Sequence, residues 1–244
     1  MGCGVSVFVS DVHLAGRFPR RLERFRRFLS DLPARARALY ILGDLFDFWV
    51  GPGHARLDRA PEVLAALADV VKAGVEVSFV SGNRDFFLAH YLLETLGVRA
   101  YPDAQSVELD GRRVLLSHGD ALCTRDRRYL RLRRILRSGL FRRLFTALPP
   151  EMAYYMGSCL RSYSRRVVRT KHHSVVSLDP AEIRRLFSTG IDVLICGHVH
   201  RPAHEVHEIG GRRCELFVLD DWSRRPGWLE YADGRFSRQT AEDG

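Results

Sequence analysis

The stretch Val5-Ser-Val-Phe-Val-Ser-Asp-Val-His13 joins a short apolar run directly to an aspartate and a histidine. A short run rich in valine and phenylalanine is typical of a buried strand in an α/β sheet. Ligands of such sheets gather in the crevice beyond the carboxyl ends of the strands. The stretch therefore predicts that Asp11 and His13 stand at the ligand-binding edge of the fold.

The same arrangement recurs four times along the chain. Further short apolar runs lie at 38–42, 75–81, 114–117 and 193–196. The polar groups that follow them at once are Gly43-Asp44, Gly82-Asn83, His118 and Gly197-His198-Val-His200. Carboxylate, amide and imidazole groups together form the ligand mixture of a divalent metal site. These seven ligands exceed the needs of one tetrahedral ion and suit two ions that share a carboxylate.

Each of these residues taken alone has an ordinary structural interpretation. An isolated aspartate after a strand usually caps a helix, and an isolated histidine is usually a surface or core residue. The ordered set at five strand ends is what favours a metal site. The other histidines lack this placement and are interpreted as structural or surface residues: His54, His90, His172, His173, His204 and His207.

The order of these motifs, D-x-H, G-D, G-N, H and G-H-x-H, resembles that of the calcineurin-like metallophosphoesterases from Val5 to about Trp222. The resemblance implies a four-layer α/β/β/α sandwich with a centre of two metal ions. It implies that one ion is held by Asp11, His13, Asp44 and His200, and the other by Asp44, Asn83, His118 and His198. Two ions about 3.5–4 Å apart can clamp the attacking and leaving oxygens of a displacement at phosphorus.

The residue after Asn83 indicates which type of phosphate bond the site can hydrolyse. Most members of that superfamily read Gly-Asn-His-Asp/Glu, and their histidine protonates an alkoxide leaving group, whereas this chain reads Gly82-Asn-Arg84-Asp85-Phe. A guanidinium cannot act as a general acid, but it can hold phosphate oxygens. The sequence therefore favours hydrolysis of a diphosphate, whose leaving group departs without a proton. The alternative is a surface ion pair between Arg84 and Asp85, which is weaker because Asn83 fixes the location.

Composition fits a single globular domain. The 244 residues are 46% hydrophobic, enough for a sizeable core. No apolar run reaches the length of a membrane-spanning helix, and the early first strand predicts that there is no signal peptide. The five cysteines form no C-x-x-C pair, so we expect reduced thiols in a cytoplasmic protein: Cys3, Cys123, Cys159, Cys196 and Cys214.

Helical and alternating patterns divide the chain into a core and an insertion. Helices are predicted at 20–30, 61–73, 86–96 and 180–187, and a hairpin at 105–117 through Asp110-Gly111. Strands at 203–209, 213–219 and 228–231 are expected to close the second sheet. We therefore predict a core formed by 1–124 and 173–233, a helical insertion at 125–172, and a loose polar tail at 234–244.

The predicted insertion is strongly basic. It holds 13 Arg and one Lys against Asp126 and Glu151, a net charge of +12 in a chain of +9. Apolar residues interleave at helical spacing: Leu132, Ile135, Leu136, Leu140, Phe141, Leu144, Phe145 and Leu148. The stripe could simply pack on the core beneath a solvated basic face. The density of like charges instead favours an anionic partner such as a membrane surface.

Four segments resemble the UDP-2,3-diacylglucosamine pyrophosphatase family more closely: 40–46, 82–86, 117–124 and 197–202. The resemblance implies that water activated at two Mn²⁺ ions cleaves UDP-2,3-diacylglucosamine, giving UMP and 2,3-diacylglucosamine 1-phosphate (lipid X) for lipid A biosynthesis. It implies an insertion that acts as a lid over the acyl chains, and a peripheral position on the cytoplasmic face of the inner membrane. We expect Leu132, Leu136, Leu140, Phe141 and Phe145 to line an apolar groove. Arg131, Arg134 and Arg137 are expected to meet lipid.

Only some of the substrate-binding residues of that family have a matching residue in this chain. The positions that match its substrate-binding residues are Asn83, Arg84, Asp126, Ser164, Lys171 and His198, with Arg161 matching one that binds the glucosamine phosphate. Val168 stands where the family has an asparagine, and a helix would place it between Ser164 and Lys171 on one face. Asp220 replaces a family glycine. These departures lie outside the predicted metal ligands.

Two alternatives remain at this point. A nucleotide pyrophosphatase acting on dinucleoside polyphosphates would use the same metal ligands, but it needs no apolar lid. A nucleic-acid-binding protein could use the basic insertion with aromatic residues such as Tyr129, Tyr154, Tyr155 and Tyr163. No zinc-finger or RNA-binding signature supports it, so no nucleic acid is expected as a partner.

Overall fold

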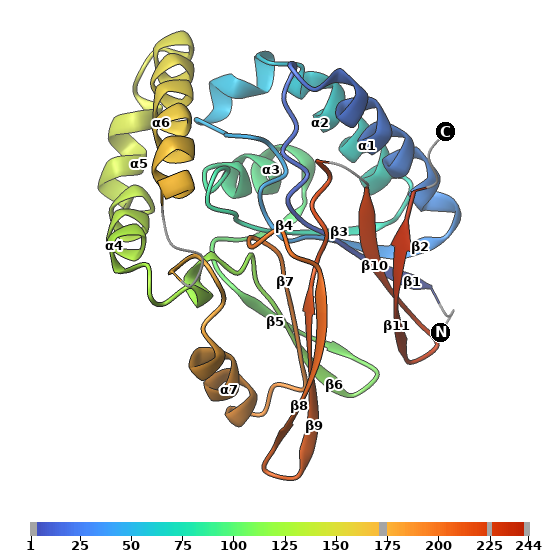
Figure 1. The fold of residues 1–244 in the computed structure, drawn as a ribbon. Helices are drawn as coiled ribbons and strands as arrows, with labels where there is room; N and C mark the ends of the chain where they lie inside the picture. Colours follow the sequence, from blue (N-terminus) through green and yellow to red (C-terminus); the bar gives the residue numbers. More distant parts are fainter. Residues whose placement is uncertain (1–3, 171–174, 224–225, 242–244) are drawn as a thin grey trace.

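The computed structural model describes residues 4–170, 175–223 and 226–241. The strands of the first sheet are β1 (Val5–Val9), β2 (Ala36–Ile41), β3 (Glu76–Val80), β4 (Arg99–Tyr101), β10 (Gly227–Ala232) and β11 (Arg235–Thr240). Those of the second sheet are β5 (Gln105–Leu109), β6 (Arg112–Leu116), β7 (Val193–Cys196), β8 (Ala203–Ile209) and β9 (Arg212–Val218). The sheets have the strand orders β11-β10-β1-β2-β3-β4 and β5-β6-β7-β9-β8 (Figure 1).

Helices cover the outer faces of the sheets and one side of the molecule. The longer helices are α1 (Pro19–Asp31), α2 (Ala60–Lys72), α3 (Leu88–Leu96), α4 (Arg127–Leu136), α5 (Gly139–Thr146), α6 (Pro150–Thr170) and α7 (Pro180–Ser188). Short 3-10 turns are η1 (Leu32–Ala34), η2 (Pro52–Arg56) and η3 (Asp120–Leu122). The predicted helices at 20–30, 61–73, 86–96 and 180–187 are therefore confirmed as α1, α2, α3 and α7, with small shifts at their ends.

Strand β1 shows how the sequence builds the layers. Val7 and Val9 pack in the cluster that includes helix residues such as Phe25, whereas Phe8 packs in the cluster between the two sheets. Successive side chains of a strand point to opposite faces, so a strand between two apolar layers is apolar at nearly every position. On the other outer face, Phe187 of α7 packs over the second sheet. The predicted four-layer α/β/β/α sandwich is confirmed.

The end of the chain corrects two predictions. The segment predicted as a strand of the second sheet, 228–231, is β10 and lies in the first sheet, antiparallel to β1. Of the segment predicted as a loose tail, Arg235–Thr240 forms β11 after a turn at Asp233 and Gly234 with φ of 51° and 76°, and residues 242–244 lie outside the described residues. Phe236 then contacts the cluster between the sheets. The same Asp-Gly signal did locate the hairpin at Asp110, where φ is 48°.

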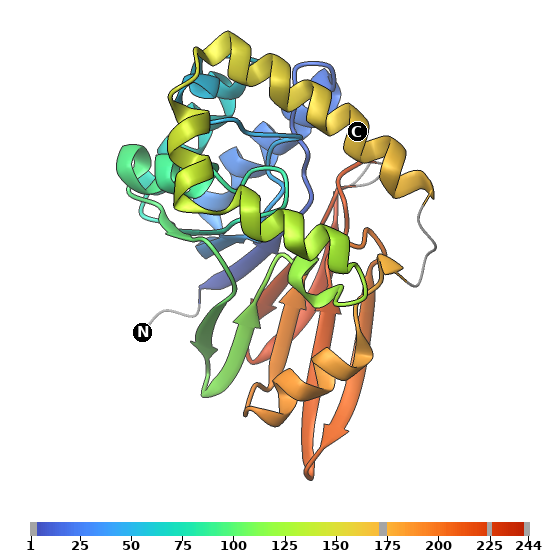
Figure 2. The same cartoon turned by 90° about the vertical axis from the view of Figure 1, so that its left-hand side faces the viewer.

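The predicted insertion contains three helices, α4, α5 and α6, as far as residue 170. They lie at the left of the sandwich in Figure 1, and Figure 2 views the molecule from that side. Phe141 and Phe145 stack on Phe87 and pack against the core while only partly buried, and their place in an apolar groove stays a prediction. Leu132 and Leu140 are 44% and 70% exposed. The apolar stripe is therefore divided between core packing and an exposed surface.

Two further expectations concern membrane spans and cysteines. Among the described residues, no helix has both the length and the apolarity that a transmembrane span requires. Cys123, Cys159, Cys196 and Cys214 carry free thiols, and Cys3 lies outside the described residues.

Candidate metal centre

Both sheets contribute side chains to one site. Asp11, Asp44 and Asn83 follow β1, β2 and β3 of the first sheet. His118 follows β6, and the segment with His198 and His200 follows β7, both in the second sheet. The carboxyl ends of these strands meet where the sheets approach each other, so ligands from distant parts of the chain gather there.

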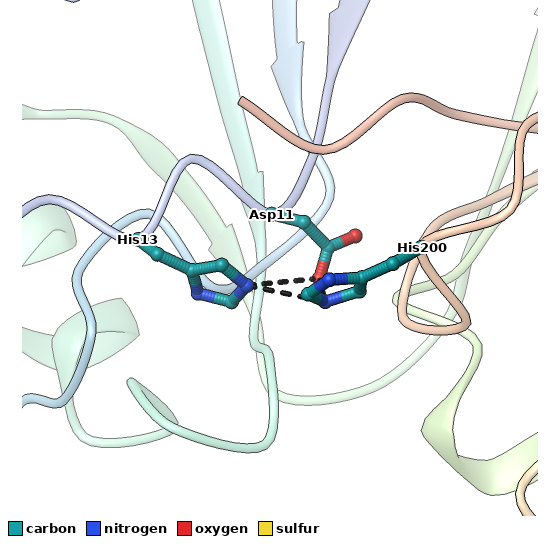
Figure 3. Close-up of side chains that lie close together, drawn as sticks. All are labelled: Asp11, His13 and His200. Carbon is teal, nitrogen blue, oxygen red and sulfur yellow. Dashed lines mark hydrogen bonds and ion pairs between the residues drawn. The ribbon is translucent and has the colours of Figure 1, made fainter. Parts of the chain in front are cut away.

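The first half of the site consists of Asp11, His13 and His200 (Figure 3). The Nε2 atoms of the two histidines lie 3.2 Å apart. Asp11 Oδ1 lies 3.7 Å from His13 Nε2 and 3.3 Å from His200 Nε2. His200 Nδ1 lies 2.9 Å from Asp221 Oδ2, which orients the ring so that Nε2 faces the site.

The second half consists of Asp44, Asn83, His118 and His198. Asn83 Oδ1 lies 2.8 Å from His118 Nε2 and 3.1 Å from His198 Nδ1. His118 Nε2 is also 3.7 Å from Asp44 Oδ1, while its Nδ1 is 2.9 Å from the carbonyl oxygen of Leu42. Asp44 connects the halves, because its Oδ2 lies 3.7 Å from His13 Nδ1.

The donor atoms fit divalent cations. Asp11 Oδ1 is buried without a hydrogen-bond partner. Asp44 Oδ2 also lacks a hydrogen bond, although Arg84 Nε lies 3.1 Å away. A buried carboxylate oxygen without a partner costs free energy, and a cation among oxygen and imidazole ligands removes that cost. The structure thus brings together all seven side chains that the sequence predicted.

The backbone of the site is strained at the ligand positions. Nine described non-glycine residues have positive φ, and five of them are Asp11, His13, Asp44, His198 and His200, with φ between 51° and 71°. The left-handed region costs such residues about 1–2 kcal/mol each. Strain of this kind persists where the surroundings enforce it, typically at functional sites.

Glycines allow the ligand loops to approach one another. A Cβ atom at Gly82 would lie 2.2 Å from Asp44 Oδ1, and one at Gly197 would lie 2.2 Å from Asp11 Oδ2. Gly43 has a φ of 81°, and a Cβ atom there would lie 2.5 Å from the Cα of Gly82. The glycine before each ligand in the Gly-Asp, Gly-Asn and Gly-His motifs is therefore a packing requirement of the site.

The histidines of the site differ in the direction in which their pKa values are shifted. Burial, with the positive charge of Arg84, lowers the pKa of His13 well below its ordinary value. Burial, with a neighbouring histidine, lowers the pKa of His198 to about 4. Burial opposes the charge on His200, but the nearby carboxylates of Asp11 and Asp221 raise its pKa to about 10. His13 and His198 therefore stay neutral at pH 7, which is the form that ligates a metal.

Asp85 is not the partner of Arg84. Its side chain is buried and accepts hydrogen bonds from the backbone N–H groups of Asp44 (3.1 Å), Leu45 (2.6 Å) and Gly82 (3.0 Å). Burial and the Asp44 charge raise the pKa of Asp85 to about 7. Asp85 thus ties the Asp44 loop to the Asn83 loop, and the alternative of a surface ion pair with Arg84 is wrong.

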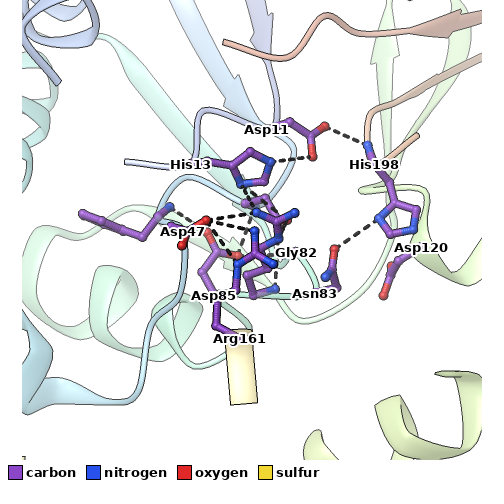
Figure 4. Close-up of polar contacts among 12 residues, drawn as sticks. Asp11, His13, Asp47, Gly82, Asn83, Asp85, Asp120, Arg161 and His198 are labelled. Atoms are coloured by element: carbon purple, nitrogen blue, oxygen red, sulfur yellow. Dashed lines mark hydrogen bonds and ion pairs between the residues drawn. The ribbon is translucent and has the colours of Figure 1, made fainter. Parts of the chain in front are cut away.

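Arg84 points into the site, where it contacts Asp44 and His13. Its Nη1 lies 3.1 Å from His13 Nδ1 and 3.1 Å from Asp47 Oδ1. Arg161 reaches the same Asp47 oxygen from α6, with Nη2 at 3.1 Å (Figure 4). The sequence did not single out Asp47 or Asp221, because both are acidic residues in loops with no motif of their own.

The other predicted substrate residues are placed as follows. Asp126 is the N-cap of α4, where its side chain accepts a hydrogen bond from Tyr129 N at 3.1 Å. Ser164 lies on an exposed part of α6. Lys171 lies outside the described residues. Asp220 forms an ion pair with Arg238 at 3.2 Å, so β11 provides a partner for the residue that replaces the family glycine.

Solved structures resemble this fold at low sequence identity. An archaeal phosphodiesterase has a TM-score of 0.52 at 13% identity, with 97% of this chain and 99% of that chain covered. A dimetal phosphatase from Danio rerio has a TM-score of 0.51 at 14% identity, with 98% and 96% covered. These similarities confirm the fold.

Sequence comparisons identify the family. A UDP-2,3-diacylglucosamine hydrolase from Azotobacter vinelandii is 38% identical, covering 94% of this chain and 95% of its own length. One from Pseudomonas aeruginosa is 37% identical, with 96% and 97% covered. The family model described as calcineurin-like phosphoesterase matches residues 6–202. The chain therefore belongs to the calcineurin-like phosphoesterases, and among them to the family of the UDP-2,3-diacylglucosamine hydrolases.

Proposed function

We propose that this protein hydrolyses the diphosphate bond of UDP-2,3-diacylglucosamine, giving UMP and 2,3-diacylglucosamine 1-phosphate. The position of Arg84 carries the proposal, because a permanent cation stands among the metal-ligand candidates where most of the superfamily has a proton donor. The relatives named for this substrate align over nearly the whole chain, which supports it. In the reaction, water attacks one phosphorus and releases a proton to the solvent, the bridging P–O bond breaks, and the phosphate monoester leaves as an anion that needs no proton.

The metal requirement is part of the proposal. We assign one ion to Asp11, His13, Asp44 and His200, and the other to Asp44, Asn83, His118 and His198. Two Mn²⁺ ions would supply an activated water and neutralise charge on the phosphates. Arg84 and Arg161 would hold the non-reacting diphosphate oxygens, since guanidinium groups bind phosphate through paired N–H donors.

The insertion would bring the protein to its lipid substrate. Its exposed apolar side chains are Leu132, Ile135, Leu140, Leu144, Met152, Tyr155, Met156 and Leu160. Exposed arginines stand on the same helices, at Arg128, Arg131, Arg134, Arg142 and Arg143. A basic helix surface with apolar side chains suits an anionic lipid surface. We therefore propose that α4, α5 and α6 dock on the cytoplasmic face of the inner membrane and cover the acyl chains.

Product analysis tests this function. Purified protein with Mn²⁺ should release UMP from detergent-dispersed UDP-2,3-diacylglucosamine. Dinucleoside polyphosphates should be cleaved far more slowly, because they offer no acyl chain, and each buried methylene contributes about 0.8 kcal/mol. The opposite preference would establish a nucleotide pyrophosphatase instead.

Substitution of Arg84 is the most direct single-residue test of the proposed function. Arg84→Ala should lower kcat/KM by about 100-fold or more, since a preorganised donor to developing charge is lost. Arg27→Ala, at an exposed arginine of α1, is the matched control and should leave kcat/KM unchanged. Arg84→His restores the superfamily's proton donor and should introduce phosphomonoesterase activity. A wild-type rate in Arg84→Ala would refute the role of this residue.

A further inference from the structure

Three arginines converge on one buried carboxylate beside the candidate metal centre. Asp47 is 2% exposed. Its Oδ1 accepts hydrogen bonds from Arg84 Nη1 at 3.1 Å and from Arg161 Nε and Nη2 at 3.2 and 3.1 Å. Its Oδ2 accepts a hydrogen bond from Arg17. The carboxylate of Asp47 is therefore shared by three guanidinium groups.

The three cations come from separate parts of the fold. Arg17 follows β1, Arg84 follows β3, and Arg161 belongs to α6 of the insertion. Asp47 itself is fixed by its backbone, since its N–H donates to the carbonyl oxygen of Leu14 at 2.9 Å. The carboxylate is thus a rigid point on the loop after β2, and the arginines are the adjustable partners.

Asp47 is the carboxylate that contacts both Arg84 and Arg161. Asp44 also lies 3.1 Å from Arg84, but it is a candidate metal ligand. Without Asp47, the guanidinium groups of Arg84 and Arg161 would repel each other while only 18% and 12% exposed. Like charges in such a poorly solvated place separate or turn to solvent.

We propose that Asp47 is a positioning residue that holds Arg84 and Arg161 together as one receptor for the diphosphate. It also fixes α6 of the insertion relative to the metal centre, because Arg161 belongs to both arrangements. The proposal rests on the function proposed above for the two arginines. Asp47 is in neither group of candidate metal ligands, and its proposed role is exerted through the cations that it orients.

Asp47→Asn keeps the shape of the side chain and removes its charge. We expect kcat/KM for UDP-2,3-diacylglucosamine to fall by about 30-fold or more, because two preorganised donors lose their orientation. The bound manganese should stay at the wild-type level. Asp192→Asn is the matched control, since Asp192 pairs with Arg212 at 2.8 Å far from the site and should leave kcat/KM unchanged.

A double-mutant cycle separates positioning from general support of the fold. If Asp47 acts through Arg161, then Asp47→Asn should cost at least several-fold less in an Arg161→Ala background than in the wild type. Equal cost in both backgrounds, or a loss of manganese that matches the loss of activity, would overturn the proposal. A fall in melting temperature with unchanged kcat/KM would overturn it as well.

Binding of a soluble diphosphate distinguishes this proposal from the proposed function. UDP-N-acetylglucosamine, titrated into the manganese-loaded protein by calorimetry, should bind at least about 10-fold more weakly to Asp47→Asn than to the wild type. Weakened binding in a protein that does not cleave the diacylated substrate would remove the proposed function and keep the role of Asp47. Unchanged binding and unchanged kinetics in an active enzyme would remove the role of Asp47 alone.

Discussion

Asp44 is the residue on which both halves of the candidate metal centre depend. It approaches His13 and His118 at 3.7 Å and accepts a hydrogen bond from Arg84 N at 3.0 Å. Asp44→Ala should lower kcat about 1,000-fold or more, since both ions lose a shared ligand and metal charge stabilisation is worth several kcal/mol. Metal analysis should show less bound manganese. Asp69→Ala, on the exposed side of α2, should change neither quantity.

His54 predicts a pH effect on stability outside the metal centre. Burial lowers its pKa to about 4, and its ring stacks on Trp49 with centroids 4.8 Å apart. The unfolded chain binds a proton below pH 6.5, whereas the folded protein does so only near pH 4. His54 therefore costs no stability above pH 6.5, and the free energy of unfolding falls as pH drops towards 4, by about 3 kcal/mol at most.

The His54→Phe variant isolates that effect. It keeps an aromatic ring against Trp49 and has no proton to bind. Urea unfolding at pH 7, 5.5 and 4.5 should show a smaller loss of stability for the variant than for the wild type. Parallel curves for the two proteins would contradict the assignment, because every other titrating group is common to both.

Residues with a local signal could be predicted from the sequence, and residues defined by distant partners could not. Asp11 and Asn83 each end an apolar run, and a glycine before Asn83 marks the close approach. Asp47 sits in a loop, and its partners Arg84 and Arg161 are 37 and 114 residues away. A single sequence holds no pattern that joins positions so far apart.

At the scale of elements, helix α4 uses its arginines in two ways. Arg133 pairs with the buried Asp120 at 2.8 Å, and Arg137 donates to the carbonyl oxygen of Gly82 at 2.9 Å. Arg137 is only 13% exposed, so the expectation that it meets lipid is wrong. These two residues fasten α4 to the loops that carry His118 and Asn83. The exposed arginines of the helix remain available for a membrane surface.

The exposed arginines predict salt-sensitive membrane binding. Replacing Arg128, Arg131 and Arg134 with Gln should weaken binding to anionic vesicles about 100-fold, at about 1 kcal/mol for each cation near the surface. High salt should weaken wild-type binding in the same way. Hydrolysis of detergent-dispersed substrate should not change.

The matched control removes the same charge from other faces. Arg27, Arg184 and Arg213 are exposed and lie outside the insertion, so their replacement with Gln should leave vesicle binding close to that of the wild type. Equal weakening by both triple variants would show that net charge alone governs binding. Binding that survives high salt and both variants would indicate an apolar anchor.

Strand existence was easier to predict than strand partners. The alternating segment at 228–231 was correctly expected to be a strand, but it pairs with β1 rather than with the second sheet. Its inner side chains, such as Leu229, are apolar, as either sheet would require. The strand with which such a segment pairs depends on the topology of the whole fold. Strand β4, at Arg99–Tyr101, is too short to show a pattern.

At the scale of the whole molecule, the candidate metal centre joins the two sheets. Asp11 and Asp44 come from one sheet, His118 and His198 from the other. Bound ions at about 1,000 times their dissociation constant would stabilise the folded state by about 4 kcal/mol. Excess chelator should therefore lower the melting temperature of the wild type by about 10 °C, and manganese should restore it. Chelator should have little effect on Asp44→Ala, and an unaffected wild type would contradict metal binding across the sheets.

Because the metal-ligand candidates have a left-handed backbone, selection for thermal stability and selection for activity favour different residues at these positions. Where no metal is bound, a lineage selected only for heat resistance would gain by placing glycine at positions 11, 13, 44, 198 and 200, because glycine adopts positive φ without the penalty that Asp and His incur. A lineage that must keep its metal cannot take that path. Laboratory evolution for thermal survival alone, carried out with excess chelator, should therefore collect inactive descendants with substitutions at these five positions, and descendants selected to stay active with manganese should carry their changes elsewhere.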